Sequence, residues 1–110
     1  MHASTKDILI FLSDMRNSLD NNRFHPICRK KNLDTLARLG ITWEDAKAEI
    51  YALQVSDYIS GPEVDRDDPS SDFFWKFKKS VLGQVIYIKL KIEYLRDSDV
   101  RVVSFHIDWI

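Results

Sequence analysis

The period of the apolar residues changes partway along the chain, and this change limits the folds that the chain can adopt. Between residues 8 and 53, apolar residues recur every three or four positions, whereas from residue 73 onward they alternate with polar ones. A period near 3.6 is typical of amphipathic helices, and a period of two is typical of strands with one buried face. The sequence therefore predicts an α+β fold, with N-terminal helices packed on a mostly antiparallel sheet.

Three helices are expected in the first half of the chain. Ser4 stands three residues before Asp7, which is a capping-box pattern with aspartate at its acidic position. Asn32 is expected to cap a second, short helix that ends before Gly40, and Thr42 is expected to cap a third. The apolar stripe of the first helix consists of Ile8, Phe11, Leu12, Met15 and Leu19.

Extended segments are expected around and after these helices. Residues 24–30 contain Pro26 and are predicted to form an edge strand or a connector. Residues 73–79, 84–95 and 100–110 are predicted to form three strands, because apolar and polar residues alternate along them. Their short connections predict an antiparallel meander with one face on the helices and one face open.

The alternation also assigns side chains to the two faces of the sheet. The inner set is expected to contain Phe73, Trp75, Phe77, Ile86, Ile88, Leu90, Ile92, Tyr94 and Trp109. In the last strand, Arg101, Val103, Phe105 and Ile107 are expected to share the side of Trp109, opposite Val102. The outer set gathers Lys76 or Lys78 with Tyr87, Lys89, Lys91, Ser104, His106 and Asp108.

Length and composition favour one domain and exclude several classes of protein. A chain of 110 residues rarely divides into two cores, so residues 1–110 are expected to form a single domain. The only cysteine, Cys28, excludes an internal disulfide and a multi-cysteine zinc site, and it is expected to be buried. Isolated histidines and the lack of a glycine-rich phosphate loop predict no metal and no cofactor.

The same features predict where the protein works. No apolar run approaches the roughly 20 residues that span a bilayer. The N-terminus, MHASTKD, lacks the basic and apolar regions of a signal peptide. A cytoplasmic protein without a membrane partner is therefore expected.

A formal net charge of −1 conceals two charged segments of opposite sign. Residues 61–72 hold five acids against Arg66, whereas residues 73–92 hold five lysines and no acid. Residues 56–72 are rich in acids, serines, glycine and proline, which predicts a long loop. The sequence thus places a basic sheet segment next to an acidic loop.

The outer set of side chains matches the needs of metal-independent RNA cleavage. That reaction needs a base for the 2′-hydroxyl, an acid for the leaving 5′-oxygen and cations beside the developing phosphorane. A histidine, with an unperturbed pKa of about 6.5, can carry either proton. Lysines stabilise the growing charge, and a tyrosine stacks on a base or hydrogen-bonds to phosphate. The alternative is a solvated strand face, on which lysines discourage edge pairing and the histidine is only exposed.

Four segments of the chain carry a resemblance to a known family. They are FFWKFKK at 73–79, GQVIYIKLKI at 83–92, VVSFH at 102–106 and, before them, LGITWEDAKAEIYALQVSDYISGP at 39–62. Together they resemble the MqsR-like toxins of bacterial type II toxin–antitoxin systems, which have the RelE-like fold of small messenger-RNA endoribonucleases. The resemblance implies messenger RNA as substrate and a cognate antitoxin as protein partner.

The resemblance also implies particular site residues. The strand tyrosine of the family falls on Tyr87, the polar residue after its tryptophan falls on Lys76, and the basic residue that ends its V-S-F strand falls on His106. A tyrosine–lysine pair of the family is replaced by Tyr58 and Ile59, so a lysine is absent from that place. This departure favours chemistry centred on the histidine.

Pleat geometry and resemblance therefore select the same candidates. His106, Tyr87 and Lys76 are the expected catalytic residues. The expected RNA-binding residues are Lys89, Lys78, Lys91, Arg29 and Ser104, with Arg29 brought in by the 24–30 strand. The predicted function is a metal-independent endoribonuclease toxin that cleaves messenger RNA by 2′-hydroxyl transesterification.

Two alternatives remain. The first is a non-catalytic RNA- or protein-binding module of RelE-like fold, which would explain a partner-facing acidic loop. The second is an antitoxin or regulator that binds DNA, which the sequence disfavours because no helix-turn-helix has a basic recognition helix.

Overall fold

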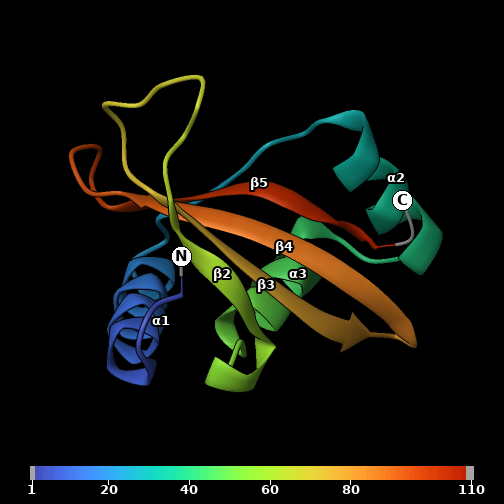
Figure 1. Ribbon diagram of the computed structural model, residues 1–110. Helices are drawn as coiled ribbons and strands as arrows, with labels where there is room; N and C mark the ends of the chain where they lie inside the picture. The colour runs from blue at the N-terminus through green and yellow to red at the C-terminus, as the bar shows by residue number, and fades with distance from the viewer. Residues whose placement is uncertain (1, 109–110) are drawn as a thin grey trace.

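The computed structural model describes residues 2–108 as three α-helices and one five-stranded sheet (Figure 1). The helical elements are α1 (Thr5–Asp20), α2 (Lys30–Leu39), α3 (Trp43–Tyr51) and the 3₁₀ helix η1 (Val55–Asp57). The strands are β1 (Phe24–Pro26), β2 (Tyr58–Glu63), β3 (Phe74–Val81), β4 (Gln84–Glu93) and β5 (Asp99–Ile107). Their order in the sheet is β1-β5-β4-β3-β2, and only the β1–β5 pair is parallel. The α+β fold with a mostly antiparallel sheet is confirmed.

Local capping residues fix the ends of the helices. The Ser4 hydroxyl accepts a hydrogen bond from the Asp7 amide, 3.1 Å away, at the start of α1. Thr42 and Asp45 form a reciprocal capping box on α3. Gly40 ends α2 in the left-handed conformation, with φ of 69°, which an L side chain rarely adopts. These three boundaries agree with the sequence prediction.

Asn32 has a different role from the predicted helix cap, because α2 begins at Lys30. Its buried amide nitrogen donates hydrogen bonds to the Ile27 and Val103 carbonyls, and its oxygen accepts one from the Phe105 amide. One turn later, the Thr35 hydroxyl accepts from the Ile107 amide. The two side chains thus satisfy backbone groups of β5 beyond the end of β1, and α2 protects an otherwise open strand edge.

Two expectations about the middle of the chain hold only in part. The strand predicted over 24–30 stops at Pro26, because the chain turns away from β5 and enters α2 at Lys30. The loop predicted over 56–72 contains most of η1 and the whole of β2. β2 forms because its backbone pairs with β3, with two register irregularities, and this pairing is not visible in its own sequence.

A bulge in β5 changes which of its side chains face inward. Lys89 pairs with Ser104 and Leu90 pairs with Val102, so Val103 is an extra residue in β5. Val102 is consequently buried in the core and Arg101 lies on the other side, opposite to the prediction. Beyond the bulge, Phe105 is buried as predicted. β5 ends at Ile107, and Trp109 lies outside the described residues.

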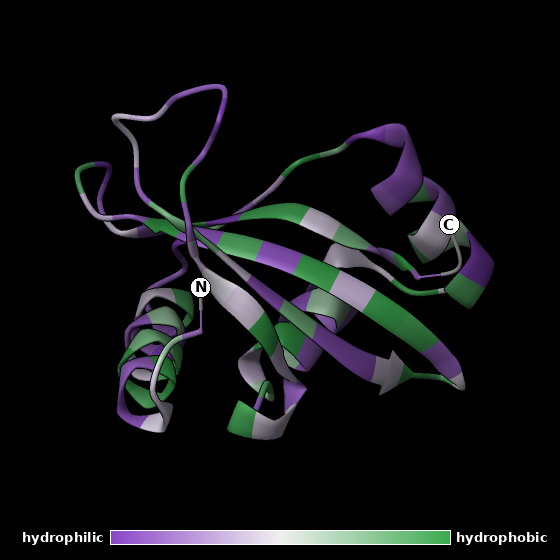
Figure 2. Cartoon of the chain, viewed as in Figure 1, coloured by the Kyte–Doolittle hydropathy of each residue, from purple (hydrophilic) through white to green (hydrophobic). Residues whose placement is uncertain are grey.

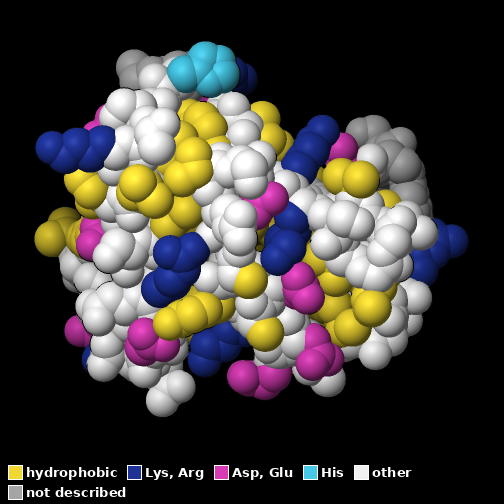
Figure 3. Space-filling model, turned by 90° about the horizontal axis from the view of Figure 1, so that it is seen from below, with side chains coloured by type: hydrophobic (Ala, Val, Ile, Leu, Met, Phe, Trp, Pro, Cys, Tyr) yellow, Lys and Arg dark blue, Asp and Glu magenta, His cyan; other side chains and the backbone are white. Residues whose placement is uncertain are grey.

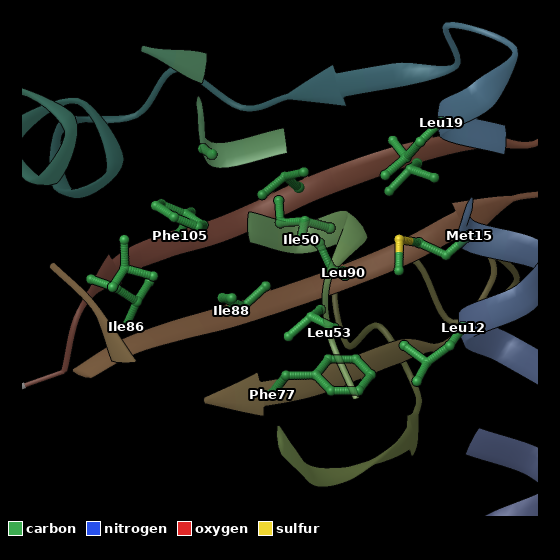
Figure 4. Close-up of a cluster of buried hydrophobic side chains, with 14 of the residues drawn as sticks. Leu12, Met15, Leu19, Ile50, Leu53, Phe77, Ile86, Ile88, Leu90 and Phe105 are labelled. Carbon is green, nitrogen blue, oxygen red and sulfur yellow. The ribbon is translucent and has the colours of Figure 1, made fainter. Parts of the chain in front are cut away.

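The core lies between one face of the sheet and helices α1 and α3 (Figures 1 and 4). All five stripe residues of α1 are buried, and they meet the inner side chains of β3, β4 and β5. Along β4 in particular, hydrophobic and hydrophilic residues alternate (Figure 2). Three residues predicted to be buried are exposed instead: Phe73 precedes β3, Tyr94 follows β4, and Cys28 lies in the connection to α2.

Candidate functional site

The opposite face of the sheet is not covered by α1 or α3 and carries most of the predicted site residues. Residues 64–73, at the top of Figure 1, and the connection into α2 border this face. Strand register places side chains on it in cross-strand rows, because residues two apart along a strand share a face. One row consists of Lys78, Tyr87 and His106, and we call it the ring row. The next row consists of Lys76, Lys89 and Ser104, and we call it the cation row.

The ring row brings an imidazole beside a phenol. The ring centroids of Tyr87 and His106 are 5.4 Å apart, with an angle of 44° between the ring planes. Nδ1 of His106 is 3.1 Å from the Ile107 carbonyl oxygen, and since a carbonyl only accepts, Nδ1 carries the proton in this hydrogen bond. In the neutral ring, Nε2 then has a free lone pair. Lys78, at the other end of the row, forms an ion pair with Asp108 at 2.7 Å.

His106 also borders a hollow of about 330 Å³ between β5 and α2. Lys31 and Arg38 of α2 line the same hollow. Lys30, the first residue of α2, pairs with Asp34 one turn later on the exposed side of the helix. The helix that protects the β5 edge thus also brings basic side chains close to the imidazole.

In the cation row, Lys76 is held by a carboxylate that the sequence analysis did not select. The Lys76 ammonium lies 2.6 Å from Glu63, the last residue of β2. The hydrogen bond that Lys76 donates to the Glu63 carboxylate raises the pKa of Lys76, and the same bond lowers the pKa of Glu63. The ammonium also interacts with the Tyr87 hydroxyl, which links the cation row to the ring row.

Lys89 and Arg29 form the part of the face that has no carboxylate partner. Arg29 donates a hydrogen bond of 2.6 Å to the Ser104 hydroxyl, and Lys89 lies 4.2 Å above the Phe74 ring. Burial, together with the nearby charge of Lys76, lowers the pKa of Lys89. Among the residues that the structure describes, neither cation has an acidic partner within ion-pair distance. This arrangement favours the binding of an anion between them.

Two of the predicted RNA-binding residues lie below the surface. Lys91 is only 5% exposed, and its ammonium contacts the Asp65 carboxylate at 3.1 Å and the Ser71 hydroxyl at 3.2 Å. Burial raises the pKa of Asp65, but the Lys91 bond and backbone amide bonds outweigh it and the pKa is lowered. Ser104 is also buried and reaches the face only through Arg29. Lys91 therefore anchors residues 61–72, which we call the acidic segment, instead of facing solvent.

A cleft of about 970 Å³ separates the cation row from residues 64–72. Its basic lining residues include Arg29, Lys76, Lys89 and Arg101. Its acidic lining residues are Glu63, Asp65, Asp67, Asp68, Asp72 and Glu93. The carboxylates of residues 63–72 thus line the same cleft as the lysines of the cation row. The opposite charges of residues 61–72 and 73–92 were the sequence signal for this contact.

No group of three or more histidine, cysteine, aspartate or glutamate side chains within residues 2–108 is arranged to hold a metal ion. Within the same range, no helix has the length and apolar character needed to cross a membrane.

Comparisons of the chain with protein-family models, with curated proteins and with solved structures gave no match.

Proposed function

We propose that this protein is a metal-independent endoribonuclease that cleaves messenger RNA in the cytoplasm and is neutralised by a cognate antitoxin. The observation that carries the proposal is the Tyr87–His106 pair beside the cation row. It joins a proton acceptor, a hydrogen-bond donor and several cations on one open face. The resemblance of roughly residues 30–106 to MqsR-like toxins supports the same activity and implies the antitoxin partner.

The geometry supports a specific division of roles. His106 accepts the proton of the 2′-hydroxyl at Nε2, since Nδ1 is engaged with the Ile107 carbonyl. The 2′-oxygen attacks phosphorus and forms a 2′,3′-cyclic phosphate, and the 5′-oxygen leaves with a proton from the Lys76 ammonium. Solvent then returns a proton from His106 to Lys76. Arg29 and Lys89 stabilise the charge on the phosphorane, and Tyr87 positions the base beside the scissile phosphate.

Single-stranded RNA suits this face better than duplex RNA. The ring of Tyr87 offers a stacking surface to an unpaired base, whereas the cations of the next row track the backbone. Residues two apart along a strand are roughly 7 Å apart, so base and phosphate subsites lie next to each other.

A second function is favoured by the acidic segment. Glu63 and Asp65 already neutralise Lys76 and Lys91, as expected for a module that binds protein or RNA without cleaving it. The two functions differ in what happens to RNA after binding.

Incubation of the purified protein with a long RNA in EDTA separates them. A metal-independent nuclease produces fragments with 2′,3′-cyclic phosphate ends under these conditions. A binding module shifts the RNA in a native gel and leaves its length unchanged.

A further inference from the structure

An apolar groove lies on the helical side of the molecule, away from the ring row and the cation row. It has a volume of about 300 Å³ and runs between α1 and the ends of β3 and β4. Its floor is the Phe11 ring stacked on Trp75, with centroids 4.6 Å apart and ring planes 16° from parallel. Hydrophobic side chains reach the surface on this side of the molecule among charged ones (Figure 3).

Large apolar side chains in the walls of the groove are exposed to solvent. Ile10 is 51% exposed, Phe73 is 50% exposed and Tyr94 is 51% exposed, and all three line the same groove. Single exposed apolar residues are ordinary, but several that converge on one hollow are typical of a surface that binds another protein.

The rim of the groove is acidic. Asp7 and Asp14 of α1 and Asp72 before β3 line it, and no lysine or arginine is among its described lining residues. Burial and a hydrogen bond to Asp14, 2.9 Å from the phenol oxygen, raise the pKa of Tyr94. A purely apolar occupant would remove water from these carboxylates and leave their repulsion unscreened. An occupant that carries positive charge removes that cost and gains complementarity.

The spacing of the acids on α1 describes the shape of the occupant. Asp7, Ile10 and Asp14 are separated by three and four residues, so they form one stripe along the exposed side of the helix. The stripe reads acidic, apolar, acidic at intervals of about one turn. A second helix packed alongside α1 matches it when lysines or arginines flank a leucine-like side chain with the same spacing.

We infer that this groove is a docking site for a cationic amphipathic helix of a partner protein. The apolar side of that helix covers the Phe11–Trp75 floor, and its basic residues pair with Asp7, Asp14 and Asp72. The inference stands apart from the proposed function, because none of these side chains belongs to the ring row or the cation row.

The experiment uses a fluorescent leucine–lysine peptide of helical periodicity and its leucine–glutamate counterpart. Binding to the full chain is followed by fluorescence anisotropy. We expect the lysine peptide to bind, with an affinity that falls as salt rises, and the glutamate peptide not to bind. Equal binding of the two peptides, or binding of neither, would overturn the inference.

A pair of variants tests where the peptide sits. Ile10→Asn is expected to weaken binding at least about tenfold, because it places a polar group in the groove. Leu33→Asn is the matched control, since Leu33 is 43% exposed on α2 and does not line the groove. Asp14→Asn should weaken binding of the lysine peptide mainly at low salt. Equal effects of Ile10→Asn and Leu33→Asn would contradict the location.

RNA cleavage by Ile10→Asn is measured in parallel and is expected to equal that of the wild type. If neither the wild type nor Ile10→Asn cleaves RNA but the wild type binds the lysine peptide, the proposed function is wrong and the groove remains a docking site. If the wild type cleaves RNA but does not bind the lysine peptide, the docking site is wrong and the proposed function remains.

Discussion

The rings of Tyr87 and His106 lie side by side on β4 and β5, with their centroids 5.4 Å apart, on the face of the sheet that α1 and α3 leave open. The two residues are direct cross-strand partners, so the antiparallel ladder fixes their separation. The bulge at Val103 reverses the orientation of the first half of β5 but leaves His106 opposite Tyr87. The relationship therefore depends on register, which the surrounding core maintains.

The Glu63–Lys76 ion pair predicts that the acidic segment weakens RNA binding. Removing the Glu63 carboxylate frees the Lys76 ammonium for a phosphate, so Glu63→Gln is expected to raise the affinity for single-stranded RNA about three- to tenfold. Anisotropy of a labelled RNA at fixed salt measures this change. Asp67→Asn is the matched control, because Asp67 is exposed and lies in the same segment. Equal gains in both variants would mean that only net charge matters.

The same ion pair predicts a pH dependence of stability. The folded-state pKa of Glu63 is lowered from 4.5, so its contribution is full above pH 4.5 and is lost as pH falls through the lowered value. We expect Glu63→Gln to lower the free energy of unfolding by less than about 1 kcal/mol at pH 7, since both side chains are partly exposed. At a pH below the lowered pKa of Glu63, the difference should vanish. Denaturant melts at the two pH values check this, and a constant difference would contradict it.

Lys89 predicts an alkaline limit for RNA binding. Its pKa is lowered from 10.5 by burial and by Lys76, and a bound phosphate stabilises the charged form, so RNA binding takes up a proton at alkaline pH. Affinity is therefore expected to fall as pH rises through the lowered pKa. Lys89→Arg keeps its charge throughout this range and should show a shallower fall. Parallel slopes for wild type and Lys89→Arg would exclude Lys89 as a phosphate contact.

The buried amide of Asn32 predicts a large loss of stability on substitution. Asn32→Ala leaves the Phe105 amide and the Val103 carbonyl of β5 without a partner in the protein interior. We expect the free energy of unfolding to fall by about 3 kcal/mol, because unsatisfied buried polar groups each cost about 1–3 kcal/mol. Asn17→Ala, at an exposed position of α1, is the control and should change stability by less than about 0.5 kcal/mol. A loss below 1 kcal/mol for Asn32→Ala would show that α2 does not hold the β5 edge.

Local signals in the sequence were sufficient for α1, for α3 and for the main strands. Ser4 and Thr42 cap helices through residues three positions away, and an alternating pattern marks β4 without reference to its neighbours. The same alternation predicted that Lys76, Tyr87 and His106 share one face, which the strand register bears out.

Features that depend on residues far apart in the chain could not be predicted from local sequence patterns. β2 contains Gly61 and Pro62 and has no strand pattern of its own, but it pairs with β3. The bulge at Val103 follows from the pairing of β5 with β4, and the buried position of Lys91 follows from the path of the acidic segment. A period of two indicates a face, but it does not indicate what lies on top of that face.

Cleavage of a long RNA in EDTA by wild type, His106→Ala and His25→Ala tests the central claim most directly. His25 lies exposed on β1 and serves as the matched histidine control. We expect wild type and His25→Ala to give fragments with 2′,3′-cyclic phosphate ends, and His106→Ala to cleave at least about a hundredfold more slowly with an unchanged melting temperature. Cleavage by His106→Ala at the wild-type rate, or intact RNA after incubation with the wild type, would contradict the account.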